Sequence, residues 1–329
     1  MSTLLTTSKM APELVLRIEA SVSGRRGARS RGVVRLRLAT WFRLATFAAL
    51  VVAVASFVRL RRLEHEQLEN ARSKLLATVK GHAAALTPDE LRIVARVDPW
   101  LMRASGPYEG DLVANELEVE GALSAVLSRP ALYVRGPTKD FQNTRVIATT
   151  SATSLKDPFV LCLLDPPASR AEKAVLTKVH AAYSGGAHLE TPTANVRRLF
   201  DAEAGLPLLM PEWAGRVRTA EDAVALGHLE HELGAAPLEA AKKAAKAQIL
   251  LFAMDDPGDS GGLSELDGER PHDVRVGLVD LRHETVLLRL RKHVDPAWIS
   301  LPKRAQYASG LDGCALALDV RTSVVPAGN

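Results

Sequence analysis

The chain has 329 residues, of which 47% are hydrophobic and 24% charged, and this composition excludes disordered, collagen-like and disulfide-scaffold proteins. Residues 1–62 carry 12 Lys and Arg against 2 Glu, whereas residues 63–329 carry 30 basic and 36 acidic side chains. Nucleic-acid-binding proteins concentrate basic residues on the folded domain, so the acidic balance of residues 63–329 argues against nucleic acid as a partner.

Residues 38–58 read LATWFRLATFAALVVAVASFV and contain one charge, Arg43. A spanning helix needs about 20 largely apolar residues, so this segment predicts a transmembrane helix, with Trp41 at the membrane interface and Arg43 reaching the near headgroups. A cleaved signal peptide is the alternative, because the small residues at 53–55 fit a cleavage site. The long basic region before the segment and the apolar residues after position 55 favour an uncleaved signal anchor.

Basic residues on the two sides of the span set the expected orientation. Seven arginines from Arg25 to Arg43 precede its apolar core, and five basic residues follow it: Arg59, Arg61, Arg62, Arg72 and Lys74. The excess on the N-terminal side predicts that residues 1–37 form a basic cytoplasmic tail, which is disordered or lies on membrane lipid. The chain is therefore expected to be a single-pass protein of the inner (cytoplasmic) membrane with a large extracytoplasmic domain.

Residues 59–86 are expected to continue as a charged juxtamembrane helix. Apolar residues recur there at intervals of three to five, at Leu60, Leu63, Leu68, Ala71, Leu75 and Val79. This single apolar stripe has two interpretations: self-association through residues 60–85, or packing of the helix on its own domain.

Residues 87–329 predict an α/β domain with a mixed sheet flanked by helices. Its start is marked by Thr87-Pro88-Asp89-Glu90, which combines an N-cap, a proline at the first helical position and a glutamate three residues after the cap. Thr219 is expected to cap a later helix. The apolar runs FVLCLL and ILLFAM predict central strands, and the last two expected strands predict an antiparallel hairpin. Strands are expected at residues 131–135, 145–150, 159–165, 248–254, 274–281 and 285–294.

Residues 258–262 spell GDSGG, which resembles the nucleophile motif of trypsin-like serine proteases. The resemblance covers five residues and implies Ser260 as the nucleophile, with the backbone N–H groups of Gly258 and Ser260 as the oxyanion hole. That family also needs an upstream His and Asp in a two-barrel β fold, whereas His180 falls in an expected helix. Ser260 is therefore expected to be a loop residue, and a membrane-anchored serine hydrolase that uses Ser260 is an alternative function.

Metal and nucleotide sites find little support in the sequence. The loop around Ser260 is expected to be solvated, because its carboxylates do not follow the EF-hand order: Asp255, Asp256, Asp259, Glu265 and Asp267. His228 and His231 are expected to face solvent, because leucines occupy the opposite face of their helix: Leu226, Leu229 and Leu233. With no phosphate-binding loop and no GxGxxG motif, the sequence predicts no metal, no cofactor and no nucleotide.

The two cysteines, Cys162 and Cys314, lie in apolar runs without a CxxC motif or a neighbouring histidine. Outside the cytoplasm they could form one disulfide; the competing interpretation is two buried thiols. The expected function is a non-catalytic binding or scaffold module on a membrane anchor, whose partner is another envelope protein, a polymer or a small ligand. Besides the hydrolase, the alternative is a structural subunit of a membrane complex that assembles through residues 60–85.

Overall fold

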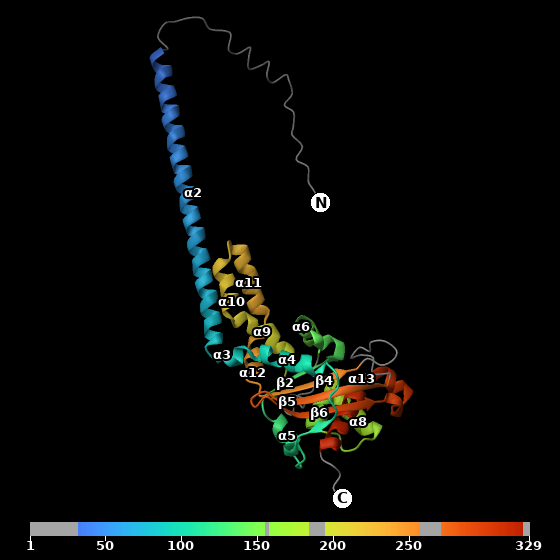
Figure 1. Cartoon of the computed structure of the whole chain (residues 1–329). Coiled ribbons are helices and arrows are strands. Elements are labelled where there is room, and N and C mark those ends of the chain that lie inside the picture. The colour runs from blue at the N-terminus through green and yellow to red at the C-terminus, as the bar shows by residue number, and fades with distance from the viewer. Residues whose placement is uncertain (1–31, 155–157, 184–194, 257–270, 325–329) are drawn as a thin grey trace. The chain divides into compact units, whose positions relative to one another are not determined.

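The computed structural model describes residues 32–154, 158–183, 195–256 and 271–324 (Figure 1). The chain divides into two compact units, residues 1–67 and residues 68–329. In its described part, the second unit is a mixed α/β structure built on a six-stranded open sheet, which confirms the expected fold class. The second unit begins at Leu68.

The sheet has the strand order β1-β6-β5-β4-β2-β3. β2 pairs in parallel with β3 and β4, and the remaining neighbours pair antiparallel. The hairpin expected near the C-terminus is confirmed as β5 and β6, and the strand expected at 248–254 is confirmed as β4. The strands are β1 (Leu112–Val113), β2 (Ala131–Pro137), β3 (Val196–Arg198), β4 (Ile249–Asp255), β5 (His272–Asp280) and β6 (Thr285–Val294).

Helices connect and cover these strands. The α-helices are α2 (Gly32–Ala83), α3 (Pro88–Leu91), α4 (Ile93–Ala104), α5 (Ala122–Leu127), α6 (Thr144–Thr153), α7 (Pro158–Leu164), α8 (Glu172–Tyr183), α9 (Leu199–Gly205), α10 (Pro211–Thr219), α11 (Ala223–Ala235), α12 (Leu238–Ala245) and α13 (Leu301–Val324). Short 3-10 helices are η1 (Asn115–Leu117), η2 (Thr138–Gln142), η4 (Leu206–Leu209) and η5 (Pro296–Trp298).

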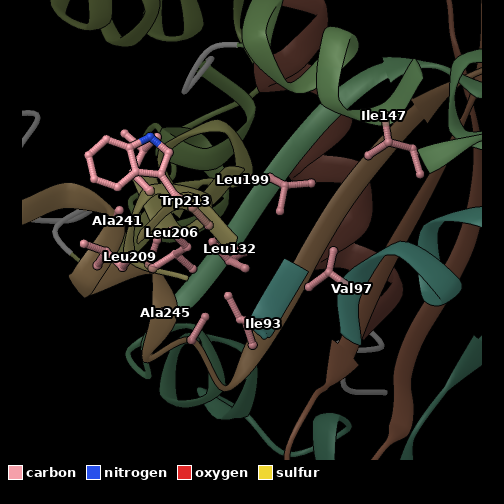
Figure 2. Packing of buried hydrophobic residues seen from close by; sticks show 14 of the residues in the cluster. Ile93, Val97, Leu132, Ile147, Leu199, Leu206, Leu209, Trp213, Ala241 and Ala245 are labelled. Carbon is pink, nitrogen blue, oxygen red and sulfur yellow. The ribbon is translucent and has the colours of Figure 1, made fainter. Parts of the chain in front are cut away.

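Two hydrophobic clusters lie on opposite faces of the sheet, because successive side chains of a strand alternate between its faces. Leu132 and Val134 of β2 belong to the first cluster, with α4, α6, α9 to α12 and the end of α2. Tyr133 belongs to the second cluster, with α5, α7, α8 and α13. Figure 1 shows α4 and α6 on one side of the strands and α5 and α8 on the other. Figure 2 shows Ile93, Leu199 and other side chains of the first cluster gathered around Leu132.

The strand expected at residues 159–165 is wrong, because this segment forms helix α7. Pro158 opens the helix at a position where its missing N–H costs nothing. Every residue from Pro158 to Leu163 is buried, since α7 packs against α13 and, through Phe159, against Tyr133, with 6.1 Å between ring centroids. A helix buried on all sides has no polar face, so its periodicity cannot distinguish it from a central strand.

The strand expected at residues 145–150 is also wrong, because these residues lie in helix α6. The helix begins after Asn143, whose side chain accepts a hydrogen bond from the backbone N of Arg145 at 2.9 Å. Its buried residues Ile147, Thr150 and Ser151 recur at helical spacing. The β-branched residues of the segment favour a strand, and packing of this one face overrides that preference.

The helix start expected at Thr87 is confirmed with both halves of its capping box. Thr87 Oγ1 accepts from the backbone N of Glu90 at 3.3 Å, and Glu90 Oε2 accepts from the backbone N of Thr87 at 2.7 Å. The cap expected at Thr219 is wrong, because Thr219 ends α10 and Asp222 caps α11 by accepting from the backbone N of Ala225 at 2.8 Å.

Helix α2 contributes to both compact units. In the first unit no residue of its most apolar 18-residue window is buried, and Trp41 is 75% exposed. This segment is long and apolar enough to cross a membrane. The apolar stripe expected at residues 60–79 divides between the units. Leu75 and Val79 are buried in the first hydrophobic cluster, whereas Leu60 and Leu63 are 59% and 47% exposed.

Candidate functional site

Charged side chains converge where β2 and β4 end. The two strands are parallel, and Pro137 pairs with Asp255, so their carboxyl ends lie at the same edge of the sheet. β5 runs antiparallel to β4 and begins at this edge with His272. Ligands of open α/β sheets bind outside the carboxyl ends of the parallel strands, which makes this edge the first candidate site.

Arg135 and Asp255 form a buried ion pair at this edge. The guanidinium donates from Nη2 to Asp255 Oδ1 at 3.0 Å and from Nε to Oδ2 at 3.2 Å, and His272 Nε2 lies 3.4 Å from Oδ1. The three residues are only 4–6% exposed. Burial by itself would raise the pKa of Asp255, but the charge of Arg135 and the hydrogen bonds from His272 and Arg135 hold that pKa below its ordinary value.

Asp256, the next residue, joins a second set of ion pairs. Its carboxylate accepts from Thr138 Oγ1 at 2.8 Å and from Arg275 Nε at 3.0 Å, and Arg291 Nη2 lies 3.2 Å from its Oδ2. Arg275 also donates to the backbone oxygen of Ala104 at 3.1 Å, so it ties the end of α4 to the sheet. The carboxylate, directly after β4, thus connects η2, β5 and β6, and Arg275 extends the connection to α4.

Asp312 of α13 lies near the ion pair without joining it. It is 1% exposed, and neither of its carboxylate oxygens has a hydrogen-bond partner. Burial raises its pKa to about 7, with the charges of His272 and Arg135 opposing that rise. This carboxyl group therefore has a pKa close to neutral pH, while the other charged groups at this edge bind one another.

The expectation of a solvated acidic loop is wrong for Asp255 and Asp256, which are both buried and paired. Asp259, Glu265 and Asp267 lie outside the described residues, as does Ser260. Among the residues that the structure describes, no group of three or more His, Cys, Asp or Glu could hold a metal ion.

The remaining predicted residues that the structure describes lie on helices α2, α7, α11 and α13. His228 and His231 are exposed on α11, while Leu226, Leu229 and Leu233 of the same helix are buried, as expected. Cys162 of α7 and Cys314 of α13 are joined by a disulfide, with 5.2 Å between their Cα atoms. In the first unit, the Arg61 guanidinium lies 5.3 Å from the Phe57 ring centroid. All five residues expected to flank the anchor are exposed: Trp41, Arg43, Arg59, Arg61 and Arg62.

A second titratable cluster joins α4, α6 and α9. Ser151 Oγ lies at 2.9 Å from the backbone oxygen of Ala148 and is also hydrogen-bonded to Glu203. A serine hydroxyl has one proton, so a protonated Glu203 that donates to Ser151 satisfies both contacts. Burial, and then the charge of Asp98, raise the pKa of Glu203 to about 7; burial raises that of Asp98 to about 6.

Glu203→Gln is expected to flatten the dependence of stability on pH. A carboxyl whose pKa is raised by folding contributes most below its unfolded pKa of about 4.3, and this contribution is lost as the pH rises through about 7. The guanidinium chloride concentration at the midpoint of unfolding should therefore decrease as the pH is raised from 4.5 to 7.5. The decrease should be steeper for the wild type than for the variant. Unfolding of full-length protein in maltoside detergent measures both curves. Glu221→Gln, at an exposed position, is the control. Identical slopes of stability against pH for the wild type and Glu203→Gln would contradict the protonated state of Glu203.

Sequence reasoning missed the buried charges because it followed apolar periodicity. One signal was present: Arg135 interrupts the run ALYV, and Asp255 and Asp256 follow directly after ILLFAM. Charges at the ends of two parallel strands meet at one edge, and opposite charges there predict pairing. Asp312 carried no comparable signal, because the approach of α13 is a tertiary feature.

No known protein family, curated protein or solved structure matches this chain.

Proposed function

We propose that this protein is a single-pass membrane protein whose α/β unit, residues 68–329, acts as a non-catalytic binding module on the extracytoplasmic side of the cytoplasmic membrane. The observation that carries the proposal is the uncovered apolar surface of α2. Phe47, Leu50 and Val54 are each more than half exposed, and no residue of the most apolar window is buried. Such a surface on a soluble protein would aggregate, and a bilayer would cover it.

The length and the ends of this segment support a span. Residues 40–58 at about 1.5 Å per residue make about 28 Å of helix, close to the thickness of a hydrocarbon core. Trp41 suits the interface at one end, and the guanidinium of Arg43 can reach the same headgroups. Arg59, Arg61 and Arg62 follow at the other end, where lipid headgroups are the expected contact.

Two observations support the extracytoplasmic side. Arginines are more numerous before the span than after it. The disulfide between Cys162 and Cys314 suits an oxidising compartment, since thiols in the cytosol are kept reduced.

A binding role, rather than chemistry, is supported by the pairing of the buried charges at the strand ends. Arg135 forms an ion pair with Asp255, and Asp256 forms one with Arg275. The hydrolase alternative rests on Ser260 alone, and a serine-reactive phosphonate adduct on that residue would establish it. Assembly through residues 60–85 would have to use the exposed stripe residues Leu60, Leu63 and Ala71, because Leu75 and Val79 are buried within their own unit.

The full-length protein is expected to stay in the membrane pellet after carbonate washing and to leave it in maltoside detergent. Leu50→Arg combined with Val51→Arg should shift the protein to the carbonate supernatant, because each arginine at a helix centre costs about 3 kcal/mol of insertion free energy. Leu60→Arg, just beyond the apolar segment, is the matched control and should stay in the pellet. Wild-type protein in the carbonate supernatant would rule out the anchor.

A further inference from the structure

A hollow of about 380 Å³ lies between α8, α13 and the end of β6. Its volume falls in the range of small-molecule sites in proteins. The apolar lining comes from Val175 of α8, Val294 of β6 and Leu318 of α13. Val175 and Val294 are themselves buried in the second hydrophobic cluster, so this lining is part of the folded core.

An exposed tryptophan forms part of the lining. Trp298 of η5 is 39% exposed, although it is the kind of side chain that usually loses most of its surface on folding. Its position follows from Asp295, whose Oδ1 accepts from the backbone N of Ala297 at 2.9 Å and so starts η5. An indole that lines a hollow offers a π face to a ligand.

Carboxylates outnumber fixed positive charges around this indole. Asp295 and Asp319 line the hollow with Arg170, which is ion-paired to Asp319. His293 also lines it, and its Nδ1 lies 2.8 Å from Asp273 outside the hollow. The fixed charges of the lining, Asp295, Asp319 and Arg170, sum to one negative, and Asp295 keeps one carboxylate oxygen beyond its bond to Ala297.

Helix α13 adds a further carboxyl group on the same face. Asp312, Ala315 and Asp319 are spaced by three and four residues, so they lie along one side of the helix. Asp312 is buried without a hydrogen-bond partner and is not part of the lining; the charges of His272, Arg135, Asp255 and Asp295 all act on it. The preference for a cation over an anion therefore comes from the lining itself, in which Asp295 and Asp319 stand against Arg170.

We infer that this hollow binds a small organic cation, an ammonium group with a compact apolar body. The ammonium lies against the Trp298 ring and near the Asp295 carboxylate, and the apolar body contacts Val175, Val294 and Leu318. The inference deepens the proposed binding role and does not require the membrane anchor. A free ammonium compound and a lipid headgroup share this chemistry.

The test compares isosteric probes that differ in charge: choline, neutral 3,3-dimethylbutan-1-ol and anionic 3,3-dimethylbutanoate. Full-length protein labelled with 5-fluorotryptophan is kept at pH 8. The detergent is a maltoside, because a detergent with a choline headgroup would compete with the probes. The chain has 4 Trp, and Trp298→Phe identifies the fluorine resonance of Trp298. Choline should shift that resonance and bind about tenfold more tightly than the neutral isostere. Comparison with glycerophosphocholine then shows whether the free cation or the lipid headgroup binds more tightly.

Asp295→Asn should weaken choline binding about fivefold and leave binding of the neutral isostere unchanged, because asparagine keeps the bond to Ala297 and loses the charge. Glu221→Gln, at an exposed position outside the hollow, should bind choline like the wild type. A Trp298 resonance that does not move, equal affinities for all three probes, or tightest binding of the anion would each overturn the inference. Carbonate extraction tests the anchor separately, so the two failures are distinguishable.

Discussion

Arg135→Met is expected to destabilise the α/β unit by about 3–5 kcal/mol, because it leaves the Asp255 carboxylate buried without its main counter-charge. Guanidinium unfolding of full-length protein in maltoside measures the loss. The cost should shrink at low pH: without Arg135, burial raises the pKa of Asp255, so this carboxyl takes up a proton and its charge disappears.

Two further variants separate the loss of this pair from general damage to the core. Arg135→Met combined with Asp255→Leu should recover much of the stability, because an apolar pair of similar size can replace a buried ion pair. Arg216→Met breaks a surface pair with Glu232, whose side chains are 56% and 40% exposed, and should cost at most about 1 kcal/mol. A double variant less stable than Arg135→Met would show that the pair is not the source of the effect.

Loss of the disulfide is expected to destabilise the protein by about 4–5 kcal/mol in the chain-entropy model, because the bond closes a loop of 152 residues. Cys162→Ala, Cys314→Ala and the double variant should cost nearly the same, since each removes the same single bond. Two independent buried thiols would instead give two smaller costs that add.

Thiol labelling tests the same bond and the compartment together. Protein prepared with an alkylating trap and then unfolded should label at neither cysteine before reduction and at both after it. Labelling of both cysteines without reductant would eliminate the bridge and weaken the case for an extracytoplasmic α/β unit.

Features that depend on local pattern were predictable from the amino-acid sequence alone. The apolar segment at 38–58, the capping box at Thr87 and the hairpin of β5 and β6 are each set by residues close in the chain. The exposed histidines of α11 were predictable for the same reason, because helical periodicity places them opposite buried leucines.

The remaining features depend on contacts between segments that lie far apart in the chain. Residues 158–164 form a helix in which α13 and the sheet bury residues 158–163, and such burial removes the polar face by which a sequence reveals a helix. The apolar stripe at residues 60–79 had two interpretations, self-association and packing on its own domain. Leu75 and Val79 pack in the first hydrophobic cluster. The ion pair of Arg135 and Asp255 and the hollow beside Trp298 join residues far apart in the chain. Local periodicity carries no information about which distant segments meet, so these features follow only from how the layers pack.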